Sequence, residues 1–495
     1  MEITRRRFLE VMGAGATWIT LSSALGCEPE QRLRAVASTT RRGQTWAFRS
    51  RPELRPPVID VTTNARGTAP GYILIAPKNG PEEEGPGQDG AMILNDSGQL
   101  AWFHSLFRED KDIMDFKVQS YKGEPVLTWW QGTHAGYGDG EYLIFDDTYR
   151  EVARFRAGNG YAGDHHEFLI SARDTALFTI YREVPMDLSP VGGPKEGAVL
   201  DGIAQELDIE TGEVLFEWHS LEHVGLDESL SAPAPDLEEA FDYFHINSIA
   251  EDGDEHLLVS ARRTSAVYKI DRQTGEVIWR LGGEKSDFEM GEGARFAYQH
   301  DVRRQPDDTI TLFDNKGAAM DEPSRGIRLK LDEDAMTATL LQEYTHPEEP
   351  FATYQANVQV LPNGNVFVGW GSAPYLSEFS KEGELLFDAN FPPEAESYRA
   401  FRFEWIGRPS NGLAMKVERE SEDKLTVYVS WNGATEVAEW EVLAGPEQLD
   451  PLGSVPWKGF ETVITVPTTE PCVGVQARDS AGRALGTVKA VKVEN

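Results

Sequence analysis

The sequence predicts an all-β protein, a six-bladed β-propeller followed by a C-terminal β-sandwich of the immunoglobulin or fibronectin type III kind. Strand-length apolar runs alternate with polar turns that contain Gly, a pattern typical of β-hairpins. Between residues 56 and 408 these runs recur in six loosely similar units of roughly 45 to 75 residues, which suits the blades of a propeller. With 46 Gly and 28 Pro among 495 residues, the composition also suits many short strands joined by turns.

The repeated unit consists of two apolar strands, a turn and a third strand. Its clearest copy has strands at 256–260 and 267–271, followed by a turn and a third strand at 274–279. The first strands of the other five units are expected at 71–75, 126–130, 176–180, 309–313 and 365–369. In a four-stranded blade the innermost strand precedes these segments, and radial packing buries each sheet against its neighbours. A long array of sandwiches, or two barrels, is the alternative arrangement.

The pattern changes after residue 410. Segments 424–431, 438–442 and 472–477 alternate apolar and polar residues, and the Asp-Ser-Ala-Gly sequence at 479–482 is typical of a hairpin turn. We therefore expect a separate sandwich over residues 412–495. It contains no candidate catalytic residue, so its expected role is structural or adhesive.

The first 27 residues have the features of an export signal. Residues 4–10 resemble a twin-arginine signal, and the apolar run at 11–25 is too short and too rich in Gly and Ala to stay as a membrane-spanning helix. The run leads into Ala-Leu-Gly-Cys at 24–27, which resembles a lipoprotein processing box. We expect export in the folded state by the twin-arginine route, and an extracytoplasmic protein anchored to the membrane through a lipid on Cys27. Residues 28–55 are then a linker.

The chain is strongly acidic, with 82 Asp and Glu against 47 Lys and Arg and a net charge of −35. Binding to nucleic acid requires positive charge near the phosphates, so DNA and RNA are excluded as partners. The same charge favours solubility at high ionic strength, where salt screens the repulsion between acidic groups. The two cysteines are Cys27 and Cys472. If Cys27 carries a lipid, an intrachain disulfide is impossible and a metal site built on cysteine clusters is excluded.

Three of the ten histidines recur at nearly the same position of the repeat. His166, His245 and His300 lie 11, 12 and 10 residues before the second residue of the first strand in three successive units. Each therefore belongs to the innermost strand of its blade, and the inner strands of a propeller line its central channel. We expect the three imidazoles to converge there as a functional site.

Imidazoles that converge beside an amide and a guanidinium suit the transfer of a sulfuryl or phosphoryl group. Histidine acts as a nucleophile or as a general acid or base near neutral pH. Asn247 and either Arg262 or Arg263 would donate hydrogen bonds to the oxygens on which negative charge develops. Three histidines also suit Zn²⁺ or another metal with an open fourth position, and the spacing leaves that alternative open.

Several strings around these residues resemble the arylsulfotransferase family. They are Asp-His-His-Glu-Phe at 164–168, His-Ile-Asn-Ser at 245–248, Ser-Ala-Arg-Arg-Thr-Ser at 260–265, Trp-Arg-Leu-Gly-Gly at 279–283 and Phe-Ala-Tyr-Gln-His-Asp at 296–301. The likeness covers about residues 55 to 405, and the motifs occur together and in order. It implies a six-bladed propeller that moves a sulfuryl group from an aryl sulfate to a phenol without the nucleotide sulfate donor PAPS, a cofactor or a metal.

The resemblance also implies a role for each site residue. His300 corresponds to the nucleophile, which forms a sulfohistidine in a ping-pong cycle. His245, Arg262 and Asn247 would hold the sulfuryl oxygens, and His166 would assist proton transfer or stabilise charge.

His165 and Arg263 are candidate substrate contacts. Each lies next to the residue that matches the motif better, which is His166 in the first case and Arg262 in the second. The aromatic residues that flank the motifs are either apolar walls for an aromatic substrate or part of the core: Phe168, Phe244, Phe296 and Tyr298.

Two features depart from the better-known bacterial members of the family. The expected sandwich is C-terminal where those members have a long N-terminal one, and a lipid on Cys27 excludes an intrachain disulfide. Three other functions remain as alternatives. They are a non-catalytic cell-surface binding module, a metal-dependent hydrolase that uses the same histidines as ligands, and a quinoprotein, for which the Thr-Gly-Glu-Val-Ile-Trp sequence at 274–279 is typical.

Overall fold

The computed structural model describes residues 33–493 apart from 80–85, 107–110 and 317–321. The predicted export signal and Cys27 lie outside the described residues. Within the described ranges the regular structure is almost entirely β, and the one α-helix, α1 (Ser220–His223), has four residues. None of the described helices has the length and apolar character that crossing a membrane requires.

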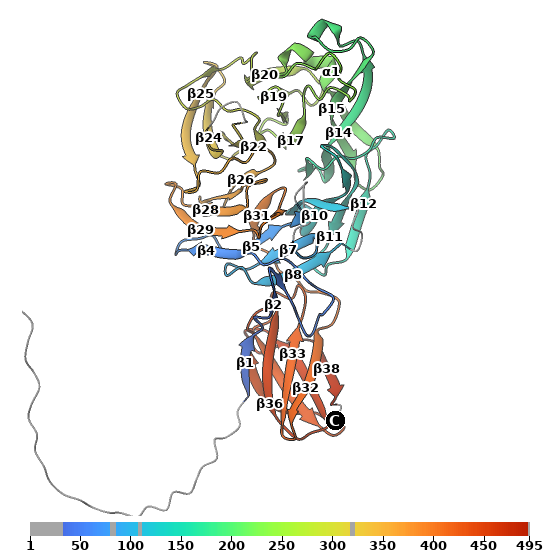
Figure 1. Cartoon of the computed structure of the whole chain (residues 1–495), viewed down its shortest axis with the longest axis vertical. Helices are drawn as coiled ribbons and strands as arrows, with labels where there is room; N and C mark the ends of the chain where they lie inside the picture. The colour runs from blue at the N-terminus through green and yellow to red at the C-terminus, as the bar shows by residue number, and fades with distance from the viewer. Residues whose placement is uncertain (1–32, 80–85, 107–110, 317–321, 494–495) are drawn as a thin grey trace, which may run out of the picture. The chain divides into compact units, whose positions relative to one another are not determined.

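Six sheets of four or five strands account for most of the described chain between residues 60 and 403 (Figure 1). All pairings in them are antiparallel except that of β21 with β25. The sheets, with strands in the order in which they pair, are β31 (Ala400–Phe403), β5 (Tyr72–Ile75), β7 (Gly90–Leu94), β8 (Leu100–Ser105); β9 (Asp112–Tyr121), β10 (Glu124–His134), β11 (Gly138–Phe145), β12 (Glu151–Phe155); β13 (Phe168–Ile170), β14 (Thr175–Met186), β15 (Gly197–Asp208), β16 (Val214–His219); β17 (Ile246–Glu251), β18 (Leu257–Ala261), β19 (Ala266–Ile270), β20 (Val277–Gly282); β22 (His300–Arg304), β23 (Thr309–Asp314), β24 (Arg325–Asp332), β25 (Thr337–Tyr344), β21 (Glu289–Met290); and β26 (Asn357–Val360), β27 (Val366–Gly369), β28 (Tyr375–Phe379), β29 (Leu385–Asn390), β4 (Asp60–Asn64). Two short pairs are β2 (Arg41–Arg42) with β3 (Thr45–Trp46) and β6 (Lys78–Asn79) with β30 (Ala395–Glu396).

The apolar runs of the sequence form the middle strands of these sheets. The six first strands predicted from the sequence coincide with β5, β10, β14, β18, β23 and β27. Every residue of β7, β18 and β23 is buried, as expected of a strand covered on both faces. β12, at the edge of its sheet, and β25, which the two-residue strand β21 covers only in part, instead mix exposed residues with half-buried or buried ones. Burial on both faces is why the middle strands show no alternation in the sequence.

Successive sheets touch one another in a closed order. β9 contacts β13, β14 contacts β17, β17 contacts β22, β22 contacts β26, β27 contacts β31, and β31 contacts β9. The two ends of the segment meet at the closure, because β31 pairs with β5 while β4 pairs with β29 on the neighbouring sheet. One edge of each sheet is formed by β31, β9, β13, β17, β22 or β26, and these six strands are called the inner strands. The expectation that such a strand precedes its unit is wrong for the first unit, whose edge strand β31 arrives from the far end of the segment.

Side-chain amides join neighbouring inner strands where no backbone ladder does. Asn357 on β26 donates Nδ2 to the carbonyl of Ala400 at 2.8 Å and accepts the Ala400 N–H at 2.9 Å. Gln359 makes the same pair of bonds with Arg402, the second residue after Ala400 on β31. Gln119 on β9 bridges two main-chain groups of β13 in this way. An amide carries a donor and an acceptor side by side, so it satisfies two groups that a strand edge leaves unpaired.

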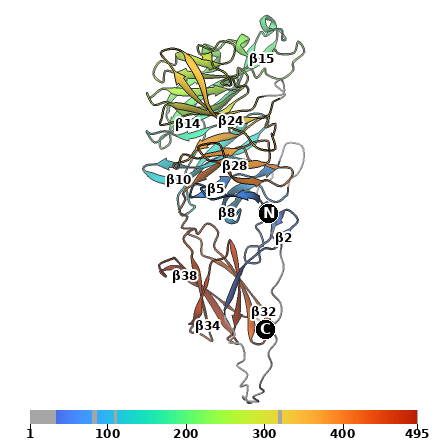
Figure 2. The same ribbon diagram turned by 90° about the vertical axis from the view of Figure 1, so that its left-hand side faces the viewer.

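The remaining strands form two four-stranded sheets that share one core. In pairing order they are β1 (Arg34–Ala37), β36 (Glu461–Pro467), β33 (Lys424–Ser430), β32 (Ala414–Ser421); and β35 (Asp450–Pro456), β34 (Glu439–Gly445), β37 (Cys472–Arg478), β38 (Ala484–Lys492) (Figure 2). Val427, Trp440 and Val475 belong to the apolar cluster that both sheets enclose. β1 lies within residues 28–55, the range expected as a linker, so that range also supplies a strand to the C-terminal sheets.

Candidate functional site

The three predicted histidines stand where inner strands begin. His166 lies two residues before β13, His245 directly before β17, and His300 is the first residue of β22. The backbone is strained here, with φ of +56° at His245 and +55° at Asp301, a region that residues other than Gly rarely adopt. The pairing of β17 and of β22 is shifted by a bulge at the same place. Such strain and bulges re-aim side chains and are common at functional sites.

Two of the histidines face one another, and an aspartate holds each of them. The ring centroids of His166 and His245 lie 4.9 Å apart, with the planes nearly perpendicular. Nδ1 of His166 lies 2.8 Å from Oδ2 of Asp164, and Nδ1 of His245 lies 2.5 Å from Oδ2 of Asp242. Each carboxylate accepts the Nδ1–H and leaves Nε2 of the ring for other partners. Burial opposes the charge on Asp242, but His245 and Arg263 outweigh it and hold the pKa of that carboxyl below its usual value.

His300 has a neutral partner in place of a carboxylate. Its Nδ1 lies 2.8 Å from Oδ1 of Asn315, and the residue is 2% exposed. Burial and then the charges of Arg262, His245 and His166 hold the pKa of His300 well below its usual value. The imidazole is therefore neutral at physiological pH. Because Arg262 and the two other histidines act on it through their charges, the four side chains form one electrostatic unit.

Arg262 and Arg263 are adjacent but do different things. Arg262 donates Nη2 to the carbonyl of Thr353 at 3.0 Å, and its guanidinium lies 5.0 Å from the ring centroid of Tyr298. Burial and the charge of Arg263 lower the pKa of Arg262, which as an arginine still remains protonated. Arg263 has a side chain that is 34% exposed and reaches Asp242 at 3.5 Å. Arg262 therefore supplies the cation beside His300, and Arg263 supports the partner of His245.

Asn247 is fully buried and is tied to the strand that carries His300. It donates Nδ2 to the carbonyl of Gln299 at 2.7 Å, while its Oδ1 has no hydrogen-bond partner among the described residues. A buried amide oxygen without a partner is rare in folded proteins and indicates a place for a donor group. One N–H of Asn247 is already used, so the second is the one available to an oxygen of a substrate.

His165 lies on the other side of His166 from His245. Its ring stacks on that of His166 with centroids 4.1 Å apart, and it also lies 5.1 Å from the ring of His134. Burial and the charge of His166 hold the pKa of His165 well below its usual value. His165 thus widens the imidazole cluster toward His134, whose Nε2 lies 3.1 Å from Asp112.

Asp164, His165 and His166 are close enough together to hold a metal ion. The oxygens of Asp164 already accept four hydrogen bonds, from Gly138 N, Thr179 Oγ1 and both the N and Nδ1 of His166. A carboxylate whose acceptor positions are filled in this way fits a structural partner of His166 better than a metal ligand. This is the only such group in the described part of the chain, and neither His245 nor His300 belongs to it.

A network of buried charges adjoins the histidines. It consists of Asp115, Lys117, Glu167, Asp301, Arg303 and Arg399. Glu167 and Asp301 directly follow His166 and His300 in the sequence, and Arg399 lies 2.8 Å from Asp115 and 3.1 Å from Glu167. Burial opposes ionisation of Glu167, but the three cations hold its pKa well below its usual value. Three carboxylates and three cations balance, so the network fixes the inner strands without adding net charge.

Sequence reasoning missed the partners of the three histidines. Asp164 stands two residues before His166, Asp242 three residues before His245, and Asn315 directly after β23. An acidic residue close before a histidine was a signal for the first two. Asn315 is 15 residues from His300 and gave no comparable signal.

Of the two alternatives for the aromatic residues that flank the motifs, the structure supports the core for the three phenylalanines. Phe168, Phe244 and Phe296 belong to the apolar core, so they are not walls for a substrate. The rings of Tyr181 and Tyr398 lie 5.7 and 5.9 Å from that of His166, and Tyr398 donates its hydroxyl to the carbonyl of His166. Tyr298 faces Arg262. Aromatic groups are therefore present at the cluster: Tyr298 comes from a motif, whereas Tyr181 and Tyr398 come from positions that the motifs did not mark.

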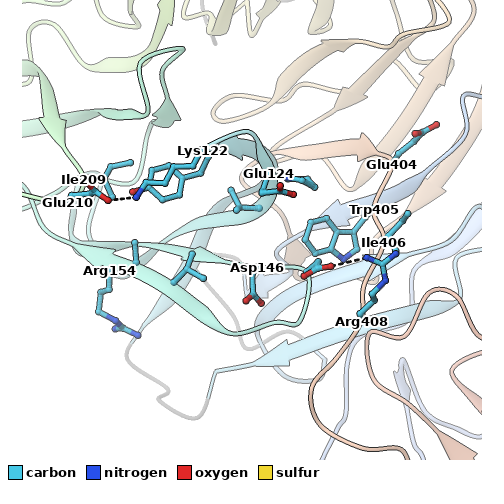
Figure 3. Close-up of a pocket in the computed structure, with 16 residues that line it drawn as sticks. Lys122, Glu124, Asp146, Arg154, Ile209, Glu210, Glu404, Trp405, Ile406 and Arg408 are labelled. Atoms are coloured by element: carbon cyan, nitrogen blue, oxygen red, sulfur yellow. Dashed lines mark hydrogen bonds and ion pairs between the residues drawn. The ribbon is translucent and has the colours of Figure 1, made fainter. Parts of the chain in front are cut away.

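A cavity of about 1150 Å³ lies away from the histidines (Figure 3). Its lining includes Lys122, Glu210 and Arg408 as well as Trp405 and Asp146. Lys122 pairs with Glu210, and Arg408 with Asp147. No histidine lines it, and carboxylates outnumber cations among its lining residues, so the cavity offers no equivalent of the imidazole cluster.

Three solved structures give the scale of structural likeness. A protein of unknown function from Bacteroides caccae is 12% identical, with a TM-score of 0.39, and the match covers 67% of this chain and 98% of that one. A catalytically inactive virginiamycin B lyase from Staphylococcus aureus, with quinupristin, is 9% identical, with a TM-score of 0.35 and coverage of 82% and 99%. A GH43 protein from Bacillus licheniformis is 10% identical, with a TM-score of 0.31 and coverage of 75% and 88%. Likeness at this level says nothing about activity.

The sequence itself gives a more specific match. No curated protein matches the chain. The profile of the arylsulfotransferase (ASST) family matches residues 117–392, more than half of the 495 residues. That range contains the seven residues predicted for the histidine site, together with Asp164, Asp242 and Asn315. The predicted lipid-attachment residue, Cys27, lies outside it. The chain belongs to the arylsulfotransferase family.

Proposed function

We propose that the protein is an aryl sulfotransferase that moves a sulfuryl group from an aryl sulfate to a phenol, without PAPS, through a sulfohistidine on His300. The observation that carries the proposal is the contrast within the cluster. One buried, neutral imidazole lies beside an arginine and two imidazoles that carboxylates hold. A neutral nucleophile beside one fixed cation and two imidazoles that can take up a proton suits attack on an anionic ester.

In the first half-reaction Nε2 of His300 attacks the sulfur of the aryl sulfate. The N–S bond forms while the bond from sulfur to the aryl oxygen breaks, and the electron pair leaves with the phenolate. His166, protonated and held by Asp164, donates its Nε2 proton to that oxygen, so that a neutral phenol departs. His300 keeps its Nδ1 proton throughout and carries the sulfuryl group as a sulfohistidine.

In the second half-reaction an acceptor phenol takes the place of the first one. The neutral His166 accepts the proton of the phenol, and the resulting oxygen attacks sulfur as the N–S bond breaks. A new aryl sulfate leaves, and His300 and His166 return to their starting states. The two halves use the same groups in opposite directions, which is the expected symmetry of a ping-pong transfer between similar alcohols.

The negative charge on the transferring oxygens is held by the groups around His300. Arg262 lies beside it as a fixed cation, and Asn247 has one free amide N–H. Burial lowers the pKa of His245 below its usual value, although Asp242 opposes this shift. His245 donates from Nε2 once it is protonated, a state that an incoming anion favours. Donors fixed in advance in a site without bulk water act more strongly than the same donors in water.

The architecture and location are part of this proposal. The closed order of sheet contacts supports a six-bladed propeller with the histidines at the starts of its inner strands. Two sheets that share one core support a C-terminal sandwich of the immunoglobulin or fibronectin type III kind. We propose export by the twin-arginine route and membrane attachment through Cys27, on the sequence signals alone.

A covalent intermediate is the direct test of the mechanism. The protein is mixed with excess 4-nitrophenyl sulfate in the absence of a phenol acceptor. We expect a burst of about one nitrophenolate per protein molecule, and mass spectrometry of the digested protein should place one added SO₃ group on the peptide that contains His300. His166→Ala, which keeps the nucleophile, should slow the burst but leave the label on His300. A burst with the label on another residue, or steady release without any label, would contradict the proposed intermediate.

A further inference from the structure

The amide of Asn315 is held in one orientation. It follows β23, is 3% exposed, and donates Nδ2 to the carbonyls of Ala352 at 2.7 Å and Gln355 at 3.1 Å. Two carbonyls can face only the NH₂ side of an amide, because an amide oxygen cannot donate. Oδ1 is therefore the atom that faces His300, at 2.8 Å from Nδ1. An oxygen acceptor at this distance requires a hydrogen on Nδ1.

The segment that orients Asn315 also orients Arg262. Ala352 and Gln355 accept from the amide, and Thr353, between them, accepts from Nη2 of Arg262. Gln355 has φ of +64°, so the backbone of this segment is itself in a strained conformation. The partner of His300 and the cation beside it are thus fixed by one short stretch of main chain.

The three imidazoles differ in what faces Nδ1. Asp164 and Asp242 present carboxylates to His166 and His245, and a carboxylate stabilises the imidazolium. Asn315 presents a neutral amide oxygen to His300, which fixes the tautomer; its hydrogen bond raises the pKa of His300, but burial and the charge of Arg262 outweigh it and keep the ring neutral. The same hydrogen-bond geometry therefore has different chemical consequences at the three rings.

We propose that Asn315 is the positioning residue of the nucleophile: it holds His300 in the tautomer with hydrogen on Nδ1, neutral, so that the lone pair that attacks sulfur is on Nε2. The role of Asn315 in catalysis rests on the proposed sulfotransfer, whereas the assignment of the His300 tautomer does not. Sequence reasoning assigns no role to this residue, and the choice of amide over carboxylate explains why His300, and not His166 or His245, is the nucleophile of the cluster.

Asn315→Asp tests the choice of an amide, because it replaces the neutral acceptor by a carboxylate of the same size; it also removes the two N–H donors to the carbonyls of Ala352 and Gln355. The charged or titratable groups that face His300 are Arg262, His245 and His166, and they are unchanged in the variant. The new carboxylate raises the pKa of His300, and protonated His300 has no lone pair on Nε2. The acid limb of the kcat/KM profile for transfer from 4-nitrophenyl sulfate to phenol should therefore move up by about 1 pH unit or more.

Two further variants separate positioning from folding. Asn315→Ala leaves Nδ1 without its acceptor and should lower kcat by roughly 10-fold to 100-fold at every pH while KM changes little. Asn95→Asp is the matched control, since it makes the same change in a turn of another sheet where the side-chain oxygen accepts two backbone N–H groups. We expect wild-type kinetics from this control, and circular dichroism should show that all three variants are folded.

The tautomer is measured independently of activity by ¹⁵N NMR of wild-type protein labelled in its histidine rings. The signals lost in His300→Ala belong to His300. We expect a protonated Nδ1 and an unprotonated Nε2 at pH 7.5, and loss of this preference in Asn315→Ala. An Nε2-protonated ring in the wild type, or an Asn315→Asp profile that superimposes on the wild type, would overturn the proposal. Inactive wild-type protein with the expected tautomer would instead contradict the proposed function alone.

Discussion

At the scale of single residues, the site is organised by the partners of its histidines. A buried neutral imidazole resists protonation, because the charged form loses its hydration and no carboxylate compensates at His300. The arginine next to it adds to this effect. The same buried position that suits His300 to its proposed role as nucleophile also links the stability of the protein to pH.

The stability that His300 contributes to the folded protein falls as the pH falls. The pKa of His300 is lower in the folded protein than in the unfolded chain, so the stability that it contributes is full above about pH 6.5 and is lost as the pH falls toward the folded value. Between pH 7.5 and 5.5 this loss approaches about 1.4 kcal/mol. In His300→Gln the fall in unfolding free energy, measured by urea denaturation at the two pH values, should be smaller by about that amount.

His256→Gln is the control for this comparison. Its side chain is 27% exposed and lies away from the cluster, so the variant should keep the wild-type difference between the two pH values. Equal pH dependence in His300→Gln and the wild type would mean that His300 is not held neutral by the fold.

The sequence marked the histidines but not their partners. His166, His245 and His300 share a position in the repeat, and a repeat can be read without a structure. Asn315 contacts His300 because β22 and β23 pair and a turn returns the chain, and no residue pattern encodes that contact. For the same reason the sequence left open whether the phenylalanines beside the motifs are core residues or substrate walls, since being next to a motif does not fix which face of a strand a side chain takes.

At the scale of strands, the inner strands depend on side chains to hold their neighbours. Asn357 and Gln359 alternate along β26 and each makes a two-point bond with β31. The buried charges of Arg399, Glu167 and Asp115 connect the same region to β9 and β13. Four of these neighbouring strands, β26, β31, β9 and β13, are therefore connected by specific polar contacts.

Replacement of Asn357 by Leu tests these contacts. The variant leaves the N–H and the carbonyl of Ala400 buried without partners, so the unfolding free energy should fall by about 2 kcal/mol or more. Gln273→Leu removes an exposed amide and should change it by less than about 0.5 kcal/mol. Both are measured by urea denaturation at pH 7.5. An Asn357→Leu protein as stable as the wild type would show that the two-point bonds do not hold β31 in place.

The sequence predicted the first strands well and the closure badly. Buried middle strands are unbroken apolar runs, which are easy to recognise. The inner strand of the first sheet is the short segment β31, and its pairing with β5 joins residues more than 300 positions apart. Local pattern carries no information about such a contact. For the same reason β1, four residues within an expected linker, was not recognised as a strand of the C-terminal sheets.

At the scale of the whole chain, the strong negative charge and the chemistry of the site oppose one another. A net charge of −35 repels an aryl sulfate, whereas Arg262 and the imidazoles attract it locally. A site that binds anions within an acidic protein relies on short-range, partly buried contacts that salt screens less than the long-range repulsion. Assays should therefore be run at low and at high salt.

Sulfotransfer through His300 is tested by transfer from 4-nitrophenyl sulfate to phenol, in wild type and in His300→Ala. We expect nitrophenolate release that depends on added phenol, forms phenyl sulfate in equal amount, and disappears in His300→Ala while the variant keeps its fold. Release that persists in His300→Ala, or that requires a metal ion and not a phenol, would contradict it. Absence of release from the wild type with every phenol tried, at low and high salt, would favour a non-catalytic binding module.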